Sequence, residues 1–134
     1  PNDEYQQIPI LYIHQYWDYY FDLDESNEPK KSLPLAHFPG TLNFDLIIQI
    51  ATEKKNYLNC TLFFTICKKI TLEELVAGTT YVIIVKNKGF LYAKLQLIDA
   101  HAILKLDLGN LNLIHINSKD ILELFECKGF YNTN

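Results

Sequence analysis

The sequence predicts a mainly β fold with one or two helices, whose C-terminal half forms a small β-barrel. The 134 residues are 49% hydrophobic, enough for the packed core of one domain or of a small module with an extension. From residue 70 onward, apolar runs alternate with tight turns at a spacing of roughly ten residues, a pattern typical of small barrels. Before residue 25, aromatic and β-branched side chains are enriched, which favours strand over helix.

The first predicted element is a strand over residues 8–24. Its apolar side chains alternate with their neighbours from Ile8 onward, and an aromatic run at 16–21 continues the pattern. Residues 25–40 contain three prolines, several small polar residues and Gly40, and predict an unusually long loop.

Residues 41–69 allow two interpretations. The apolar side chains between 44 and 51 recur at helical spacing, and Thr41 or Asn43 is available as the helix N-cap. The apolar side chains between 42 and 50 also alternate, as they would in a strand. We predict a helix over 43–57 and a strand over 60–68, with the strand alternative for the first segment left open.

The residues after 70 predict the barrel. Thr71 can cap a short helical turn, because Glu74 follows three residues later at the capping-box spacing. Apolar runs separated by tight turns then predict strands at 79–85, 90–98, 101–108 and 111–116, and a second helical turn at 119–124.

These elements predict a division of the chain into three parts. Residues 1–69 form an N-terminal extension with a strand pair, a loop and a helix. Residues 70–126 form a small SH3-like barrel of bent strands. Residues 127–134 form a tail.

The order of features over residues 75–125 resembles that of a Tudor domain. Tudor barrels typically combine a Gly before the first strand, a turn ending in Gly, an aromatic second strand, an Asp-Tyr-Gly-Asn turn and a closing Leu-x-x-Leu turn. The upstream segments resemble the strands and helix of the staphylococcal-nuclease-like, OB-type half of extended Tudor modules. The matching residues are Gly78 with Tyr81-Val82-Ile83-Ile84-Val85, then Asn87-Lys88-Gly89, Phe90-Leu91-Tyr92-Ala93-Lys94-Leu95, Asp107-Leu108-Gly109-Asn110 and Asp120-Ile121-Leu122-Glu123-Leu124.

The resemblance implies a site related to the methylarginine cage of Tudor domains, in which several ring faces attract a weakly hydrated cation. Asn110 and Asp107 match the family's turn residues. Leu108, however, stands in place of the turn Tyr, and Lys105 stands in place of a cage aromatic. The resemblance therefore implies a degenerate cage with little or no preference for methylated arginine.

Two aromatic residues of the second barrel strand remain beside this turn. We predict a peptide-binding wall formed by Phe90, Tyr92, Leu108 and Asn110, with Asp107 as the charge partner of an arginine. Tight-turn geometry gives an alternative explanation of Asn110 and of Asp107, because Asn tolerates left-handed backbone and Asp caps turns.

The aromatic run at 16–21 supplies a second candidate surface. In a strand, Tyr16, Asp18 and Tyr20 would share one face, and aromatic side chains beside carboxylates suit an arginine- or lysine-bearing peptide. The alternative is a strand buried between the barrel and the helix.

The charged residues favour a basic partner and disfavour nucleic acid. The net charge is −4, all 12 cations are lysines, and there is no arginine for base-edge or phosphate recognition. Residues 1–35 hold seven carboxylates and two lysines, so the N-terminal end is the acidic one.

The odd number of cysteines (Cys60, Cys67 and Cys127) and the apolar neighbours of the first two predict reduced thiols in an intracellular protein.

The sequence contains no pattern typical of an enzyme. The four histidines are scattered without metal-ligand spacing, and the common nucleophile, phosphate and zinc motifs are missing. We therefore expect no catalysis, no cofactor and no metal. No apolar stretch approaches the ~20 residues of a membrane span, so we expect no membrane association.

The sequence therefore predicts a non-catalytic protein-interaction module that binds an unmodified arginine-rich peptide. The Tudor resemblance implies a Piwi-family Argonaute tail as partner, a scaffold role in small-RNA silencing, and a cytoplasmic location such as a perinuclear germ granule. A homodimerisation role is the architectural form of the same hypothesis. The alternatives are an RNA-binding small barrel, a methylarginine reader with a rearranged cage, and an unrelated all-β protein.

Overall fold

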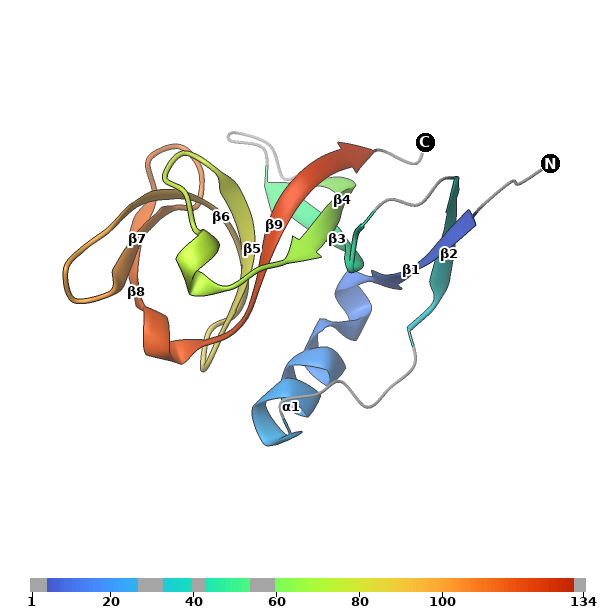
Figure 1. Cartoon of the computed structure of the whole chain (residues 1–134), viewed down its shortest axis with the longest axis horizontal. Helices are drawn as coiled ribbons and strands as arrows, with labels where there is room; N and C mark the ends of the chain where they lie inside the picture. The colour runs from blue at the N-terminus through green and yellow to red at the C-terminus, as the bar shows by residue number, and fades with distance from the viewer. Residues whose placement is uncertain (1–4, 27–32, 40–42, 54–59, 132–134) are drawn as a thin grey trace.

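Nine strands and one α-helix make up the regular structure of the parts of the chain that the computed structural model describes, residues 5–26, 33–39, 43–53 and 60–131 (Figure 1). The mainly β prediction is therefore confirmed. The helix α1 spans Tyr16–Ser26. The strands are β1 (Tyr5–Leu11), β2 (Leu35–Pro39), β3 (Leu46–Glu53), β4 (Cys60–Lys69), β5 (Thr80–Val85), β6 (Gly89–Ile98), β7 (Ile103–Asp107), β8 (Leu113–Asn117) and β9 (Ile121–Tyr131).

All nine strands belong to one mixed sheet in the order β2-β1-β3-β4-β9-β5-β6-β7-β8. The β1–β3 pair is parallel and the other pairs are antiparallel. Strand β9 lies at the centre and joins β4 to β5. Figure 1 shows β5–β8 curling together at one end of the sheet, with α1 and β1–β4 at the other end.

Strand β5 is buried on both faces, and it separates two hydrophobic cores. Its odd-numbered residues face what we call the aliphatic core, and its even-numbered residues face the aromatic core. The aliphatic core comprises Ile70, Tyr81, Ile83, Val85, Ala93, Leu95, Leu104, Leu106, Ile116 and Leu124. The aromatic core comprises Leu11, Tyr19, Tyr20, Leu23, Leu46, Ile48, Ile50, Cys67, Val82, Ile84 and Phe125.

The hairpin strands of the C-terminal half follow the predicted pattern. Asn87 and Gly89 adopt positive φ in the β5–β6 turn, and Gly109 and Asn110 do so between β7 and β8, as their residue types favour. The predicted capped turn is the 3₁₀ helix Leu72–Glu74, where the Glu74 carboxylate accepts from the Thr71 backbone N–H at 3.1 Å. Four of the predicted strands and the first capped turn are therefore confirmed.

The predicted strand over 8–24 is wrong beyond β1. After the 3₁₀ helix Ile13–Gln15, residues from Tyr16 onward form α1. The aromatic side chains favoured a strand because of their intrinsic propensity. Tertiary packing prevails, because four large side chains at helical spacing reach the aromatic core from one helix face: Tyr16, Tyr19, Tyr20 and Leu23.

The predicted helix over 43–57 is also wrong, since residues Leu46–Glu53 form β3. Both faces of β3 are buried: Ile48 packs in the aromatic core, and Ile47 packs in a third cluster with Ile8 and Phe64. A strand buried on both faces gives a continuous apolar run, which imitates helical spacing over a short segment. Residues 54–57 of the prediction lie outside the described residues.

Three smaller differences concern the loop, the last turn and the tail. Residues Leu35–Pro39 of the predicted loop form β2, paired with β1. The predicted helical turn at 119–124 is a 3₁₀ helix over Ser118–Asp120, after which β9 begins. Strand β9 continues to Tyr131 and pairs there with β4, so the segment predicted as a tail contributes to the sheet.

Among the described residues, no helix is both long and apolar enough to span a membrane.

Candidate functional site

An aromatic groove of about 630 Å³ lies where the N-terminal segments meet the C-terminal hairpins. One side comes from the start of α1 and from β3, and the other comes from β6 and the β7–β8 turn. Among the residues that the structure describes, none of those that line this groove is charged. The lining residues are Ile13, Tyr16, Ile50, Ala51, Thr52, Val82, Phe90, Leu91, Tyr92, Leu108, Gly109, Asn110 and Asn112.

Tyr16 is held in a fixed position beside the groove. Its ring stacks on Phe90 with a centroid distance of 4.0 Å and an interplanar angle of 12°. Its hydroxyl donates a hydrogen bond to the backbone carbonyl of Gln49, whose side chain also accepts from the Ile13 backbone N–H at 3.2 Å. Burial raises the pKa of Tyr16, so its hydroxyl remains a donor at neutral pH. Gln49 on β3 thus fixes the start of α1 against the sheet.

Tyr92 is the third ring of the groove. It is half-buried and makes an edge contact with Phe63, at a centroid distance of 5.5 Å. Burial raises the pKa of Tyr92. Tyr92 packs against the aromatic core together with Phe90, and both rings also line the groove.

The structure brings together four of the five residues predicted for the peptide wall. Phe90, Tyr92, Leu108 and Asn110 all line the groove. Asp107 does not line it, because its carboxylate accepts from the backbone N–H of Gly109 at 2.8 Å and closes the β7–β8 turn. The turn-capping explanation of Asp107 is therefore the one that the geometry supports.

The second predicted surface does not form as a single face. A helix turns by about 100° per residue, so Asp18 points away from the side that carries Tyr16. Tyr20 is buried, and its hydroxyl accepts from the backbone N–H of Asn87 at 2.7 Å. Of the three residues proposed for this surface, Tyr16 alone lines the groove.

Sequence reasoning missed Ile13 and the β3 residues of the groove: Ile50, Ala51 and Thr52. The helical spacing from Tyr16 to Leu23 was the available signal, because it would have turned Tyr16 toward the sheet. Nothing local in the sequence indicates that β3 borders the β7–β8 turn.

The outer face of α1 carries two exposed rings. Trp17 is 68% exposed and Phe21 is 51% exposed, and their rings stack with a centroid distance of 5.7 Å. Every charged residue of α1 is acidic, which places the negative charge of the N-terminal end around these rings: Asp18, Asp22, Asp24 and Glu25.

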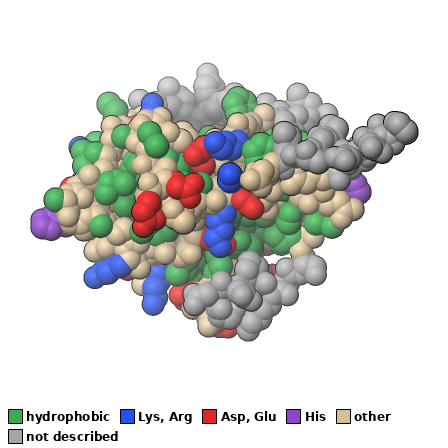
Figure 2. Space-filling model, in the orientation of Figure 1, with side chains coloured by type: hydrophobic (Ala, Val, Ile, Leu, Met, Phe, Trp, Pro, Cys, Tyr) green, Lys and Arg blue, Asp and Glu red, His purple; other side chains and the backbone are tan. Residues whose placement is uncertain are grey.

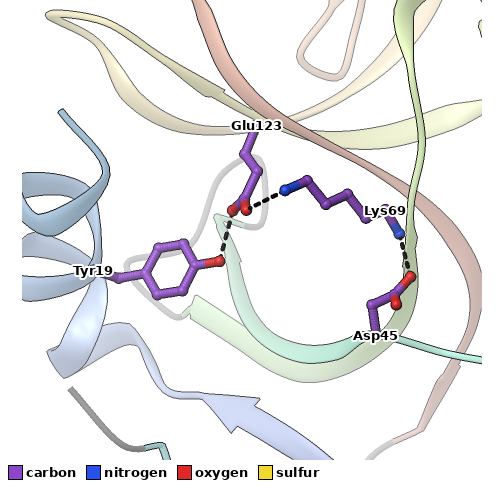
Figure 3. Close-up of polar contacts among 4 residues, drawn as sticks. All are labelled: Tyr19, Asp45, Lys69 and Glu123. Carbon is purple, nitrogen blue, oxygen red and sulfur yellow. Dashed lines mark hydrogen bonds and ion pairs between the residues drawn. The ribbon is translucent and has the colours of Figure 1, made fainter. Parts of the chain in front are cut away.

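A polar cluster that runs from two buried residues to two exposed ones lies beside α1 (Figure 3). Glu123 on β9 is 7% exposed, accepts from the Tyr19 hydroxyl at 2.6 Å and pairs with the Lys69 ammonium at 3.1 Å. The Lys69 backbone N–H donates to Asp45 at 2.7 Å. Burial, and after it the Glu123 carboxylate, raise the pKa of Tyr19. These contacts join the helix, β9, β4 and the segment before β3.

The surface charges are mixed rather than segregated on the face shown in Figure 2. Lysines and carboxylates lie next to one another in the middle of this face, between hydrophobic side chains. Within the described part of the chain, no group of three or more His, Cys, Asp or Glu residues is placed to hold a metal ion. The groove is therefore the feature of the described structure most suited to binding a ligand.

Comparison of the chain with protein-family models, with curated proteins and with solved structures finds no match in any of the three. The Tudor resemblance and the type of barrel therefore stay predictions.

Proposed function

We propose that this chain is a non-catalytic protein-interaction module that binds an arginine-bearing peptide in the aromatic groove. The observation that carries the proposal is the convergence of three rings and two side-chain amides in a groove that no charged side chain among the described residues lines: Tyr16, Phe90, Tyr92, Asn110 and Asn112. As part of the same proposal, β5–β9 form an SH3-like Tudor barrel, and the N-terminal segments form the start of an extended Tudor module.

Arginine is the side chain that such a groove recognises best. A guanidinium stacks on aromatic faces, and each good cation–π contact contributes about 0.5–2 kcal/mol. The Asn110 amide oxygen is a suitable acceptor for a guanidinium N–H. Lys105, which the resemblance places at a cage position, does not line the groove, so no like charge opposes the ligand there.

The groove favours an unmodified arginine over a caged methylarginine. Tyr16 and Phe90 stack directly on one another at 4.0 Å. A cation held between two rings needs about 3.5–4 Å on each side, so these two rings leave no space for it. The ligand is therefore proposed to lie across the outer faces of the rings. The Tudor resemblance adds the proposal that the peptide is a Piwi-family Argonaute tail used in small-RNA silencing.

The decisive measurement is calorimetric titration with one Arg-Gly-rich peptide in unmodified, symmetrically dimethylated and Arg→Lys forms. We expect the unmodified peptide to bind at least as tightly as the dimethylated one, and the Lys form to bind more weakly. Binding of the dimethylated form alone would show that Tyr16 and Phe90 separate to form a rearranged cage. Failure of all three peptides to bind would overturn the proposal and leave an architectural role.

Two substitutions locate the site. Asn110→Gly removes the amide and keeps the positive φ of 53° accessible, and we expect it to weaken binding about tenfold. Asn87→Gly is the matched control, since Asn87 has a φ of 66° in a turn outside the groove. Phe90→Leu keeps an apolar side chain but removes the ring, and we expect a loss of about 2- to 30-fold.

A further inference from the structure

Two cysteine thiols face each other across the centre of the sheet. Cys67 on β4 and Cys127 on β9 are register partners in an antiparallel pair. Both are free thiols, Cys67 fully buried and Cys127 partly buried, and both pack in the aromatic core. Their placement puts them at the junction between the two halves of the sheet, next to the groove residue Tyr92.

The strand register places the two cysteines opposite each other, at a separation that a disulfide can span. Directly opposed residues of antiparallel strands have Cα atoms about 4.5–5.5 Å apart, within the range of about 4.4–6.8 Å found for disulfides. A register shift between Ile66 and Cys67 places a bulge beside the pair, and a bulge increases local bending. The two thiols lie close enough that each shifts the pKa of the other.

The environment distinguishes the two sulfurs. The Cys67 thiol donates to the backbone carbonyl of Thr65 at 3.6 Å. The interaction between the two neighbouring thiols lowers the pKa of Cys127 and, together with burial, raises that of Cys67. The thiolate is the reactive form of cysteine, so the more exposed residue is also the better nucleophile. Cys67 needs no access from solvent, because its reaction partner is the neighbouring sulfur.

We propose that Cys67 and Cys127 form a reactive dithiol that a small disulfide, such as oxidised glutathione, converts into a cross-strand disulfide between β4 and β9. This inference goes beyond the proposed peptide-binding function and does not depend on it.

The reaction proceeds in two thiol–disulfide exchanges. The Cys127 thiolate attacks one sulfur of oxidised glutathione, forms a mixed disulfide and releases one glutathione thiolate. Cys67 then loses its proton, and its thiolate attacks the Cys127 sulfur, which forms the protein disulfide and releases the second glutathione thiolate. The two protein thiols are oxidised, one glutathione disulfide is reduced, and the two protons pass to the released thiolates.

The test uses the whole chain incubated with oxidised glutathione, followed by acid quenching, alkylation in denaturant and mass spectrometry with peptide mapping. We expect a loss of about 2 Da before alkylation, one alkylated cysteine instead of three, and a cross-linked peptide pair containing Cys67 and Cys127. The Cys60→Ser variant should give the same cross-link. Three alkylated cysteines after treatment, or a cross-link through Cys60, would overturn the proposal.

Two further variants test the assigned order of attack. Cys67→Ser should stop at the mixed disulfide on Cys127, and Cys127→Ser should leave Cys67 unmodified. A stable mixed disulfide on wild-type Cys127, without closure, contradicts the proposal even if either variant fails to fold, because that measurement needs no substitution.

Discussion

The two faces of β5 differ in what they pack against. The face with Tyr81, Ile83 and Val85 meets aliphatic side chains from β6–β9, and the Tyr81 hydroxyl accepts from the Val76 backbone N–H at 2.8 Å. The face with Val82 and Ile84 meets tyrosines, phenylalanines and two thiols from α1, β4, β6 and β9, together with aliphatic side chains that include those of β3. One strand therefore supports two cores of different chemistry.

The difference separates stability from recognition. None of the fully buried residues of the aliphatic core lines the groove. Most of these residues lie on hairpin strands that are close together in the sequence. The aromatic core borders the groove, the Glu123 cluster and the dithiol, and its members come from segments far apart in the chain. Leu91 and Leu108, which are partly buried, pack against the aliphatic core and also line the groove. Changes at the fully buried positions of the aliphatic core should alter folding alone, and changes in the aromatic core should alter folding and binding together.

The largest expected effect comes from Ile83→Ala compared with Val82→Ala. Ile83 is fully buried in the aliphatic core, so its truncation should cost about 2–5 kcal/mol of unfolding free energy, measured in urea, and leave the peptide dissociation constant unchanged. Val82→Ala should cost about 1–3 kcal/mol and also weaken peptide binding, because Val82 lines the groove. A change in peptide affinity in folded Ile83→Ala protein would break the comparison.

An intermediate effect is expected from Tyr19→Phe. The variant removes the hydroxyl that donates to buried Glu123, and we expect a loss of about 1–3 kcal/mol. Tyr20→Phe is the matched control. Its hydroxyl accepts from the N–H of exposed Asn87, which water can satisfy, so the loss should be about 1 kcal/mol or less. If both variants lost the same unfolding free energy in urea, the hydrogen bond to Glu123 would stabilise the fold no more than the one to Asn87.

Tyr19 also makes the stability of the fold depend on pH in alkaline solution. Because the pKa of Tyr19 is raised in the folded state, the protonated hydroxyl is favoured there. Its contribution is complete below the ordinary value of 10.0 and is lost as the pH rises above that value toward the folded pKa. Unfolding of wild-type protein above pH 10 should therefore show a decline in stability that is smaller in Tyr19→Phe.

The smallest expected effect comes from a change in the turn between β6 and β7. Asp99 closes the turn between β6 and β7 by accepting from the backbone N–H groups of Ile103 at 3.0 Å and His101 at 2.8 Å. These hydrogen bonds lower the pKa of Asp99 below the ordinary value of 3.8. The contribution is complete above that value and is lost as the pH falls through the folded pKa. Asp99→Asn should flatten the acid limb of the thermal-melting profile slightly, without changing peptide binding. An unchanged acid limb would contradict this assignment.

The C-terminal hairpins could be predicted from the sequence because their signals are local. Asn87, Gly89, Gly109 and Asn110 mark turns by their backbone preferences, and the strands between them follow. The N-terminal half could not be predicted in the same way. Tertiary packing turns the aromatic run into α1, and burial on both faces makes β3 resemble a helix.

The groove shows the same division. Phe90, Tyr92, Leu108 and Asn110 were predictable because two neighbouring hairpins carry them. Tyr16 could be predicted as a binding residue, but its position opposite Phe90 depends on the packing of α1, and the strand assumption placed it with Asp18 instead. The contribution of β3 depends on strand order in the sheet, which no local pattern specifies.

The place of β9 in the sheet has a consequence for how the chain is made. Of the nine described strands it is the last to be synthesised, yet it pairs with both β4 and β5. Until it emerges, each of those strands keeps one edge of unpaired backbone groups, and such edges recruit other chains. During synthesis the nascent protein therefore passes through a stage with two open edges, in which a chaperone that shields strand edges would improve its yield.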